Sequence, residues 1–148
     1  MKEVTVEPPQ LFTSHWRSPL LADVDAVIVG VSRGTPRWPL PFKYRRLLNL
    51  APGNQAWNAE DQEAFERSYL KQLEVLGTEA ILADLERVAA VKPAILVCWE
   101  KPGEWCHRRR IADYLHARTG IVIPELKHGM LEKRSTAQPT LFDQKGGV

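Results

Sequence analysis

The stretch PAILVCWE, residues 93–100, decides the fold. It is the clearest β-strand in the chain, because it is apolar and is followed at once by a polar loop. The residues before it, 78–92, begin with a threonine cap and predict a helix, and residues 106–120 predict another that ends at a glycine. The run IVIPEL, 121–126, then predicts a further strand. Alternation of helices and strands predicts an α/β domain with a mainly parallel sheet.

The N-terminal half extends this pattern. The run VDAVIVGVSRG, 24–34, is apolar and β-branched, which is typical of a strand buried on both faces. Residues 35–46 contain three prolines and predict an irregular loop, and 47–53 predict a short strand that stops at Pro-Gly. Residues 58–77 predict a helix with an asparagine cap, and its core face is formed by Phe65, Tyr69, Leu73 and Leu76.

Composition places these elements in one ordinary domain. The chain has 148 residues, of which 44% are hydrophobic and 26% charged, as in soluble globular proteins. We therefore expect a single Rossmann-like, three-layer α/β domain over residues 1–127 and a flexible tail over 128–148. No apolar run predicts a membrane span or a signal peptide, and the 2 cysteines fit a reducing compartment, so we expect a cytoplasmic protein.

Three polar segments follow predicted strands or open a predicted helix. They are Ser32-Arg33-Gly34, Cys98-Trp99-Glu100 and Cys106-His107-Arg108. Ligands of open α/β sheets bind beyond the carboxyl ends of the strands, so these segments are the candidate site.

The residue types at this predicted site suit an anionic ligand. A helix start near Cys106 attracts phosphate, and Ser32, Arg33 and Arg108 would add donors. The same surroundings favour a thiolate at Cys106, which would then be a nucleophile. Glu100 or His107 would provide acid–base catalysis.

Each of these residues also has a purely structural interpretation. Cys98 lies in an apolar run and is expected to be a small buried hydrophobe, whereas packing and function fit Cys106 equally well. Arg108 could pair with Glu100 or Glu104, Arg109 and Arg110 could form a solvated helical face, and Trp99 and Trp105 could pack in the core.

Bound metals and cofactors are not expected from the sequence. Cys98, Cys106 and His107 lack the paired spacing of a zinc site, since adjacent residues rarely bind one ion together. The chain contains neither a Walker phosphate loop nor a GxGxxG motif.

The proline-rich loop and the tail suggest partners. The loop interleaves basic and aromatic residues, including Lys43 and Tyr44, a combination that suits phosphates and bases of a nucleotide or nucleic acid. The net charge of +2 is by itself too small to argue for nucleic acid. The tail sequence AQPTLFDQ resembles peptides that dock on the bacterial sliding clamp, through Gln138, Leu141 and Phe142.

Four segments together resemble the family called domain of unknown function 488. They are TSHW, VSRGTPRW, FKYRRLLNLAPG and ILVCWEKPGEWCHRRRIADYL, and the resemblance runs roughly over residues 11–125. It implies a compact Rossmann-like domain whose Cys98, Glu100, Cys106, His107 and Arg108 gather at one edge. Many members have Asp-Val-Arg after the first strand, where this chain has Val31-Ser32-Arg33, so a mechanism that requires that aspartate is not expected.

Three functions remain open from the sequence. The first is binding or processing of a phosphate-bearing ligand, a nucleotide or nucleic acid, at the strand ends. The second is a non-catalytic adaptor of DNA repair or replication that docks on the sliding clamp through its tail. The third is a thiol redox protein that uses Cys98 and Cys106.

Overall fold

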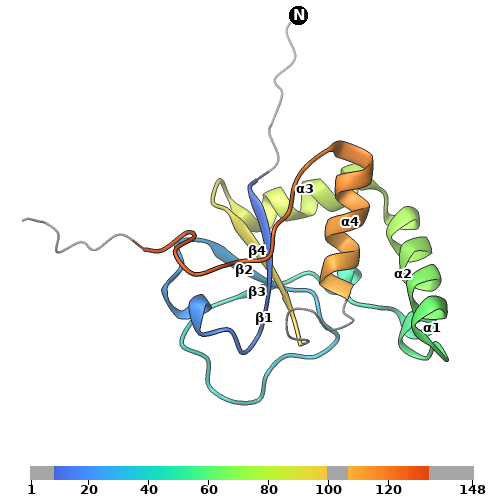
Figure 1. Ribbon diagram of the computed structural model, residues 1–148, viewed down its shortest axis with the longest axis horizontal. Helices are drawn as coiled ribbons and strands as arrows, with labels where there is room; N and C mark the ends of the chain where they lie inside the picture. The colour runs from blue at the N-terminus through green and yellow to red at the C-terminus, as the bar shows by residue number, and fades with distance from the viewer. Residues whose placement is uncertain (1–8, 100–106, 134–148) are drawn as a thin grey trace, which may run out of the picture.

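The computed structural model describes residues 9–99 and 107–133, which contain a four-stranded sheet with helices packed on it (Figure 1). The strands lie in the order β1-β4-β2-β3, and all the pairings are parallel. Their bounds are β1 Leu11–His15, β2 Val27–Gly30, β3 Arg45–Arg46 and β4 Ala94–Cys98. The predicted α/β domain with a parallel sheet is confirmed.

β4 lies inside the sheet and is buried along its whole length. It pairs with β1 over five residues and with β2 over four. Because strand side chains alternate between faces, Leu96 and Cys98 enter one core cluster while Ile95 and Val97 enter the other. The continuous apolar run in the sequence therefore supplies buried side chains to the cores on both faces of the sheet.

Helices cover one face of the sheet. They are the short α1 (Asn54–Trp57), α2 (Gln62–Leu76), α3 (Thr78–Ala89) and α4 (His107–Thr119). The core face predicted for α2 is confirmed, with Phe65, Tyr69 and Leu73 buried and Leu76 packed against them. The cap of α2 differs from the prediction, because Asp61 rather than Asn58 accepts a bond from the backbone N–H of Ala64, at 2.8 Å.

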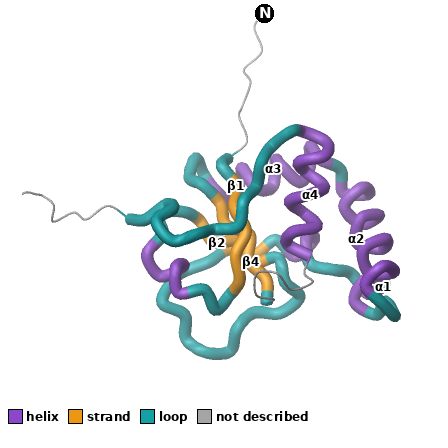
Figure 2. The backbone as a smooth tube through the Cα atoms, in the orientation of Figure 1, coloured by secondary structure: helices purple, strands orange, loops and turns teal. Residues whose placement is uncertain are grey.

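The opposite face carries a 3-10 helix, η1 (Pro19–Asp23), and loops rather than long helices (Figure 2). Trp16, Leu21 and Val24 pack there with partly buried side chains of the proline-rich loop, Leu40, Phe42 and Tyr44. The loop is thus a structural layer, and its apolar residues explain why it folds against the sheet although its prolines prevent regular structure.

Three segments differ from the sequence-based expectation. β1 was not anticipated, because LFTSH is too polar to read as a core strand, although Thr13 and Ser14 are buried. Residues 47–53 are not a strand: the chain pairs with β2 only at β3 and then forms the 3-10 helix η2 (Leu48–Leu50). Residues 121–126 are not a regular strand either, since they meet β1 in one bridge between Thr13 and Glu125.

Proline limits this last segment. Thr13 donates its backbone N–H to the carbonyl of Pro124, and Leu126 donates to the carbonyl of Thr13. Pro124 has no N–H with which to extend the ladder. Beyond it the chain stays against the domain, and the N–H of Lys133 donates to the carbonyl of Asp23 at 3.1 Å. Within the described ranges, every helix is too short or too polar to cross a membrane.

Trp16 is the tightest packing point near the strand ends. Its side chain is buried, and its indole N–H donates to the hydroxyl of Ser32 at 2.9 Å. A Cβ atom at Gly30 would lie 2.7 Å from the indole ring, closer than van der Waals contact permits. Glycine at position 30 therefore lets the indole lie directly on β2.

We predict that Gly30→Ala lowers the free energy of unfolding by about 1–3 kcal/mol, because the ring must move away from the sheet. Urea denaturation measures this change. Gly34→Ala is the matched control, since a Cβ there meets no atom within 4 Å, and it should leave stability almost unchanged. Equal effects of the two substitutions would contradict the packing argument.

Candidate ligand-binding site at the strand ends

Parallel pairing brings four strand ends to one edge of the sheet. The strands end at His15, Gly30, Arg46 and Cys98. The residues that follow include Ser32, Arg33 and Trp99, and His107 at the start of α4 lines the same cavity, so each of the three segments predicted as a site contributes to this edge.

A cavity of about 460 Å³ opens at this edge, which is within the usual range for small-molecule sites. Its walls come from the ends of β2 and β4, from the segment around α1, and from the start of α2 and of α4. The lining residues are Ser32, Arg33, Gly34, Pro52, Ala56, Trp57, Ala59, Phe65, Trp99 and His107. Aromatic and aliphatic surface dominates, and Arg33 and His107 supply the ionisable groups.

Arg33 is held at the mouth of the cavity by neutral acceptors. Its Nη1 donates to the carbonyl of Pro52 at 2.9 Å, and its Nη2 donates to the side-chain oxygen of Asn54 at 3.3 Å. Its guanidinium carbon lies 4.9 Å from the centre of the Trp57 ring, a cation–π contact. These bonds orient the guanidinium, and no carboxylate in the described part of the chain pairs with it, which suits an anionic ligand.

His107 is the first residue of α4 and is buried in the cavity wall. Its Nε2 lies 2.6 Å from the carbonyl oxygen of Val31, so this nitrogen carries the proton and donates it. The edge of the Tyr69 ring meets the imidazole at a centroid distance of 5.5 Å. Together these contacts fix the position and orientation of the imidazole ring in the cavity wall.

Arg108 takes a different place from the one that the phosphate hypothesis requires. Its side chain is only 1% exposed, and two of its nitrogens donate to the carboxylate of Glu125, at 3.2 and 3.0 Å. A third donates to the sulfur of Cys98 at 3.1 Å. Among the described residues, the partner of this ion pair is Glu125. Glu100 and Glu104, the partners that the sequence suggested, lie outside the described ranges. The cavity wall does not include Arg108.

Arg109 joins the same buried network. It donates to the hydroxyl of Thr13 at 2.8 Å and to the carbonyl of Ile123 at 2.7 Å, while the Thr13 hydroxyl donates to Glu125 at 2.6 Å. These bonds tie α4 to β1 and to the segment after α4. Arg109 is therefore no freely solvated residue, whereas Arg110 pairs at the surface with Glu66 and Asp113.

Ser32 lines the cavity, but its hydroxyl is used internally. It accepts the indole N–H of Trp16 and donates to the carbonyl of Gly34, at 2.9 and 2.5 Å. Lys43 and Tyr44 lie elsewhere, beside a separate surface hollow lined by the first residues of β2 and the end of α3. The structure thus brings Ser32, Arg33 and His107 together and keeps Lys43, Tyr44 and Arg108 apart from them.

Several predicted site residues lie outside the described ranges. Glu100 and Cys106 fall in 100–106, and Gln138, Leu141 and Phe142 fall in 134–148. Their catalytic and clamp-docking roles stay predictions, as does the redox pairing of Cys98 with Cys106. Cys98 itself is fully buried in the core, as the structural interpretation of its thiol predicted.

The aromatic residues of the cavity were the part that sequence reasoning missed. Trp57 was not singled out, and for Trp99 packing in the core was one of the open interpretations, yet their side chains are 60% and 37% exposed. No local sequence pattern marked Trp57, because the four-residue helix α1 that carries it was not predicted.

The comparisons with known proteins now decide the family. The model for "Domain of unknown function DUF488" matches residues 21–115. The chain belongs to this family. The match covers β2, β3, β4 and most of α4, including Arg33, Trp57, Trp99 and His107, and it confirms the resemblance seen in the sequence. No curated protein and no solved structure matches the chain.

Metal binding receives no support from the described part of the chain. Over residues 9–99 and 107–133, no three side chains among His, Cys, Asp and Glu come close enough together to hold an ion. The chemistry that this part of the site offers is aromatic stacking, one oriented guanidinium and one imidazole.

We predict that Glu125→Gln lowers the free energy of unfolding by about 2–4 kcal/mol, because it removes the carboxylate charge that pairs with the buried Arg108 guanidinium in the described structure. Thermal and urea denaturation measure the loss. Glu74→Gln is the control, since its ion pair with Arg118 is exposed on both sides and contributes about 1 kcal/mol at most. A Glu125 variant as stable as the control would show that the buried pair does not hold α4.

Proposed function

We propose that the protein binds a phosphate-bearing nucleotide in the strand-end cavity. The observation that carries this proposal is Arg33, whose guanidinium stands at the cavity mouth beside the exposed Trp57 ring and bonds only neutral oxygen atoms in the described structure. A base and a phosphate need these two surfaces next to each other.

The walls of the cavity match the apolar part of such a ligand. Trp57 and Trp99 present indole surface to it, and Phe65 and Pro52 close it with further apolar surface. A nucleobase stacks on indole irrespective of its hydrogen-bonding edges, and each stacking contact contributes about 1–3 kcal/mol. The volume of about 460 Å³ accommodates one nucleotide unit rather than a folded macromolecule.

Electrostatics favour the phosphate. Arg33 offers a charge-assisted donor at the mouth, and His107 marks the start of α4, so the positive end of the helix dipole points towards the same cavity. Arg108 supports this arrangement indirectly. Because its charge is matched by Glu125, we assign it to fixing α4 and assign phosphate contact to Arg33.

Processing of the ligand forms part of the same proposal. Of the two residues predicted for acid–base catalysis, Glu100 or His107, His107 lies in the cavity wall, where its hydrogen bond to the carbonyl of Val31 orients the imidazole. Glu100 and Cys106 keep their proposed roles as base and nucleophile, since Glu100 follows Trp99 and Cys106 precedes His107 in the chain.

We predict that adenosine and uridine monophosphates raise the melting temperature of the full chain, since a ligand that binds only the folded state stabilises it. Inorganic phosphate and the free nucleosides should each give a smaller shift. In Arg33→Ala the affinity for both nucleotides should fall about 10- to 100-fold, the effect of losing one hydrogen bond to a charged group. Isothermal titration calorimetry measures the affinity.

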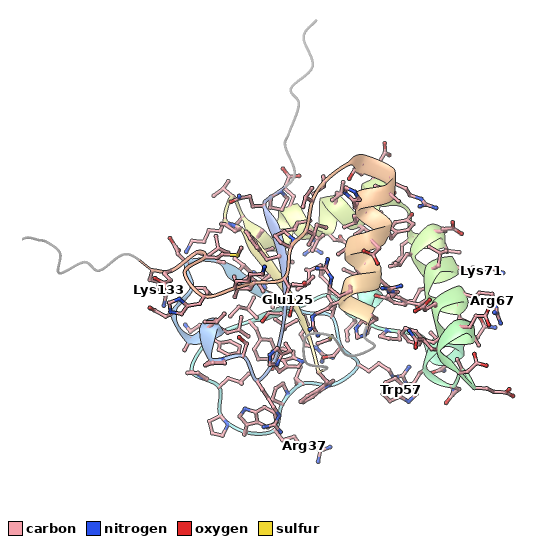
Figure 3. All side chains as sticks on the ribbon, in the orientation of Figure 1. Arg37, Trp57, Arg67, Lys71, Glu125 and Lys133 are labelled. Atoms are coloured by element: carbon pink, nitrogen blue, oxygen red, sulfur yellow. The ribbon has the colours of Figure 1, made fainter. Side chains whose placement is uncertain are left out.

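Arg67→Ala is the matched control, because Arg67 lies on the outer side of α2, away from the cavity (Figure 3). It should bind nucleotides as the wild type does. Unchanged affinity in Arg33→Ala, with the melting temperature of the unliganded variant also unchanged, would remove Arg33 from the site. Absence of any shift with nucleotides in the wild type would reject the proposed function itself.

A further inference from the structure

The aromatic and cationic surface at the strand ends continues beyond the cavity. Trp99 lines the cavity, and its ring meets that of Trp38 edge to face at a centroid distance of 5.8 Å. Trp38 belongs to the proline-rich loop, is 37% exposed and is not part of the cavity wall. A single nucleotide in the cavity would therefore leave a second exposed indole unused.

The second indole repeats the arrangement of the first. The guanidinium carbon of Arg17 lies 4.3 Å from the centre of the Trp38 ring, as that of Arg33 lies 4.9 Å from the centre of the Trp57 ring. Each indole thus has a cation on it, and Trp99 lies between the two pairs. An aromatic face with an adjacent guanidinium fits one base and one phosphate, so two such pairs fit consecutive nucleotides.

Further arginines lie along the same edge. Arg46 donates to the carbonyls of Ser32 and Arg33, at 3.4 and 3.0 Å, which places it next to the first pair. Arg37 precedes Trp38 and projects outwards at the lower edge of the molecule (Figure 3). In residues 9–99 and 107–133, no carboxylate forms an ion pair with Arg17, Arg33, Arg37 or Arg46.

This absence is selective. Five of the six arginines on α2, α3 and α4 pair with an acid within the described chain: Arg67, Arg87, Arg108, Arg110 and Arg118. The sixth, Arg109, donates to the Thr13 hydroxyl and the Ile123 carbonyl. Within residues 9–99 and 107–133, most helical arginines therefore have a carboxylate partner, whereas the four arginines along the strand ends have none. Such a local excess attracts a polyanion even though the net charge of the chain is only +2.

We propose that the ligand of this edge is a single strand of nucleic acid, which places one nucleotide in the cavity and the next one on Trp38. The proposal rests on the function proposed above and specifies its substrate class. The strand lies across the carboxyl ends of β4 and β2. Arg33 and Arg17 contact successive phosphates, and Arg37 and Arg46 strengthen the field around them. A duplex does not fit, because its bases are already stacked and cannot reach the indoles.

The test compares ligand lengths on the full chain. Calorimetry at low salt measures the affinity for thymidine monophosphate and for thymidine strands of two, four and eight nucleotides. Oligouridine strands of the same lengths and a duplex octamer are titrated for comparison. We expect affinity to rise at least tenfold from the mononucleotide to the tetranucleotide and then to level off. The duplex should bind no better than the mononucleotide. The comparison of deoxyribose with ribose strands identifies which polymer binds more tightly.

Variants separate the two ends of the surface. Trp38→Ala and Arg17→Ala should reduce tetranucleotide affinity to the level of the mononucleotide while leaving mononucleotide affinity unchanged. Trp38→Phe should retain most of the gain, because it keeps an aromatic face. Arg17→Ala should also lower the salt dependence of oligonucleotide binding by about 0.7 in the slope of log K against log salt, the contribution of one phosphate contact on a single strand. Arg67→Ala again serves as the control.

The possible failures are distinct. If mononucleotides bind and longer strands gain nothing, the single-strand proposal is wrong and the proposed function stands. If longer strands bind more tightly but Trp38→Ala and Arg17→Ala have no effect on that gain, the strand does not cross this edge, and the proposal is equally wrong. If neither mononucleotides nor strands bind, both proposals fall.

Discussion

The whole arrangement depends on β4 having no free side. Its backbone must pair with strands on both edges, and its side chains must be buried on both faces. β1 and β2 pair with the two edges of β4. The helices cover the side chains on one face, and η1 with the proline-rich loop covers those on the other face. Because both neighbours run parallel to β4, the loops that carry Trp16, Arg33 and Trp99 are forced to the same edge.

The buried charges have a distinct part in this scheme. Arg108 and Glu125 lie behind the cavity rather than in it, and their ion pair joins the first turn of α4 to the segment that lies on β1. His107 is the neighbour of Arg108 in the chain, so the pair indirectly fixes where the imidazole enters the cavity wall. A buried arginine can thus matter to a site without meeting its ligand.

The sequence predicted those features that depend on local patterns. The apolar runs of β2 and β4, the core face of α2 and the convergence of Arg33 and His107 followed from periodicity and from the geometry of parallel sheets. Features that depend on distant partners were not predicted. β1 carries the buried polar residues Thr13 and Ser14, so it forms a strand because it pairs with β4 and not because of its own sequence pattern. Arg108 pairs with Glu125 because the chain returns to β1 after α4. Trp57 and Trp99 are exposed because they line the cavity, and a cavity cannot be predicted from a local sequence pattern.

The two edges of the sheet are closed in different ways. On the β1 side, residues 121–126 cover the edge and stop at a proline, whereas on the other side β3 consists of just two residues, Arg45 and Arg46. A short edge strand of two like charges offers a neighbouring molecule almost no template for strand addition, and it repels an identical edge. The same pair of arginines that adds positive charge to the sheet therefore also protects the protein against edge-to-edge aggregation.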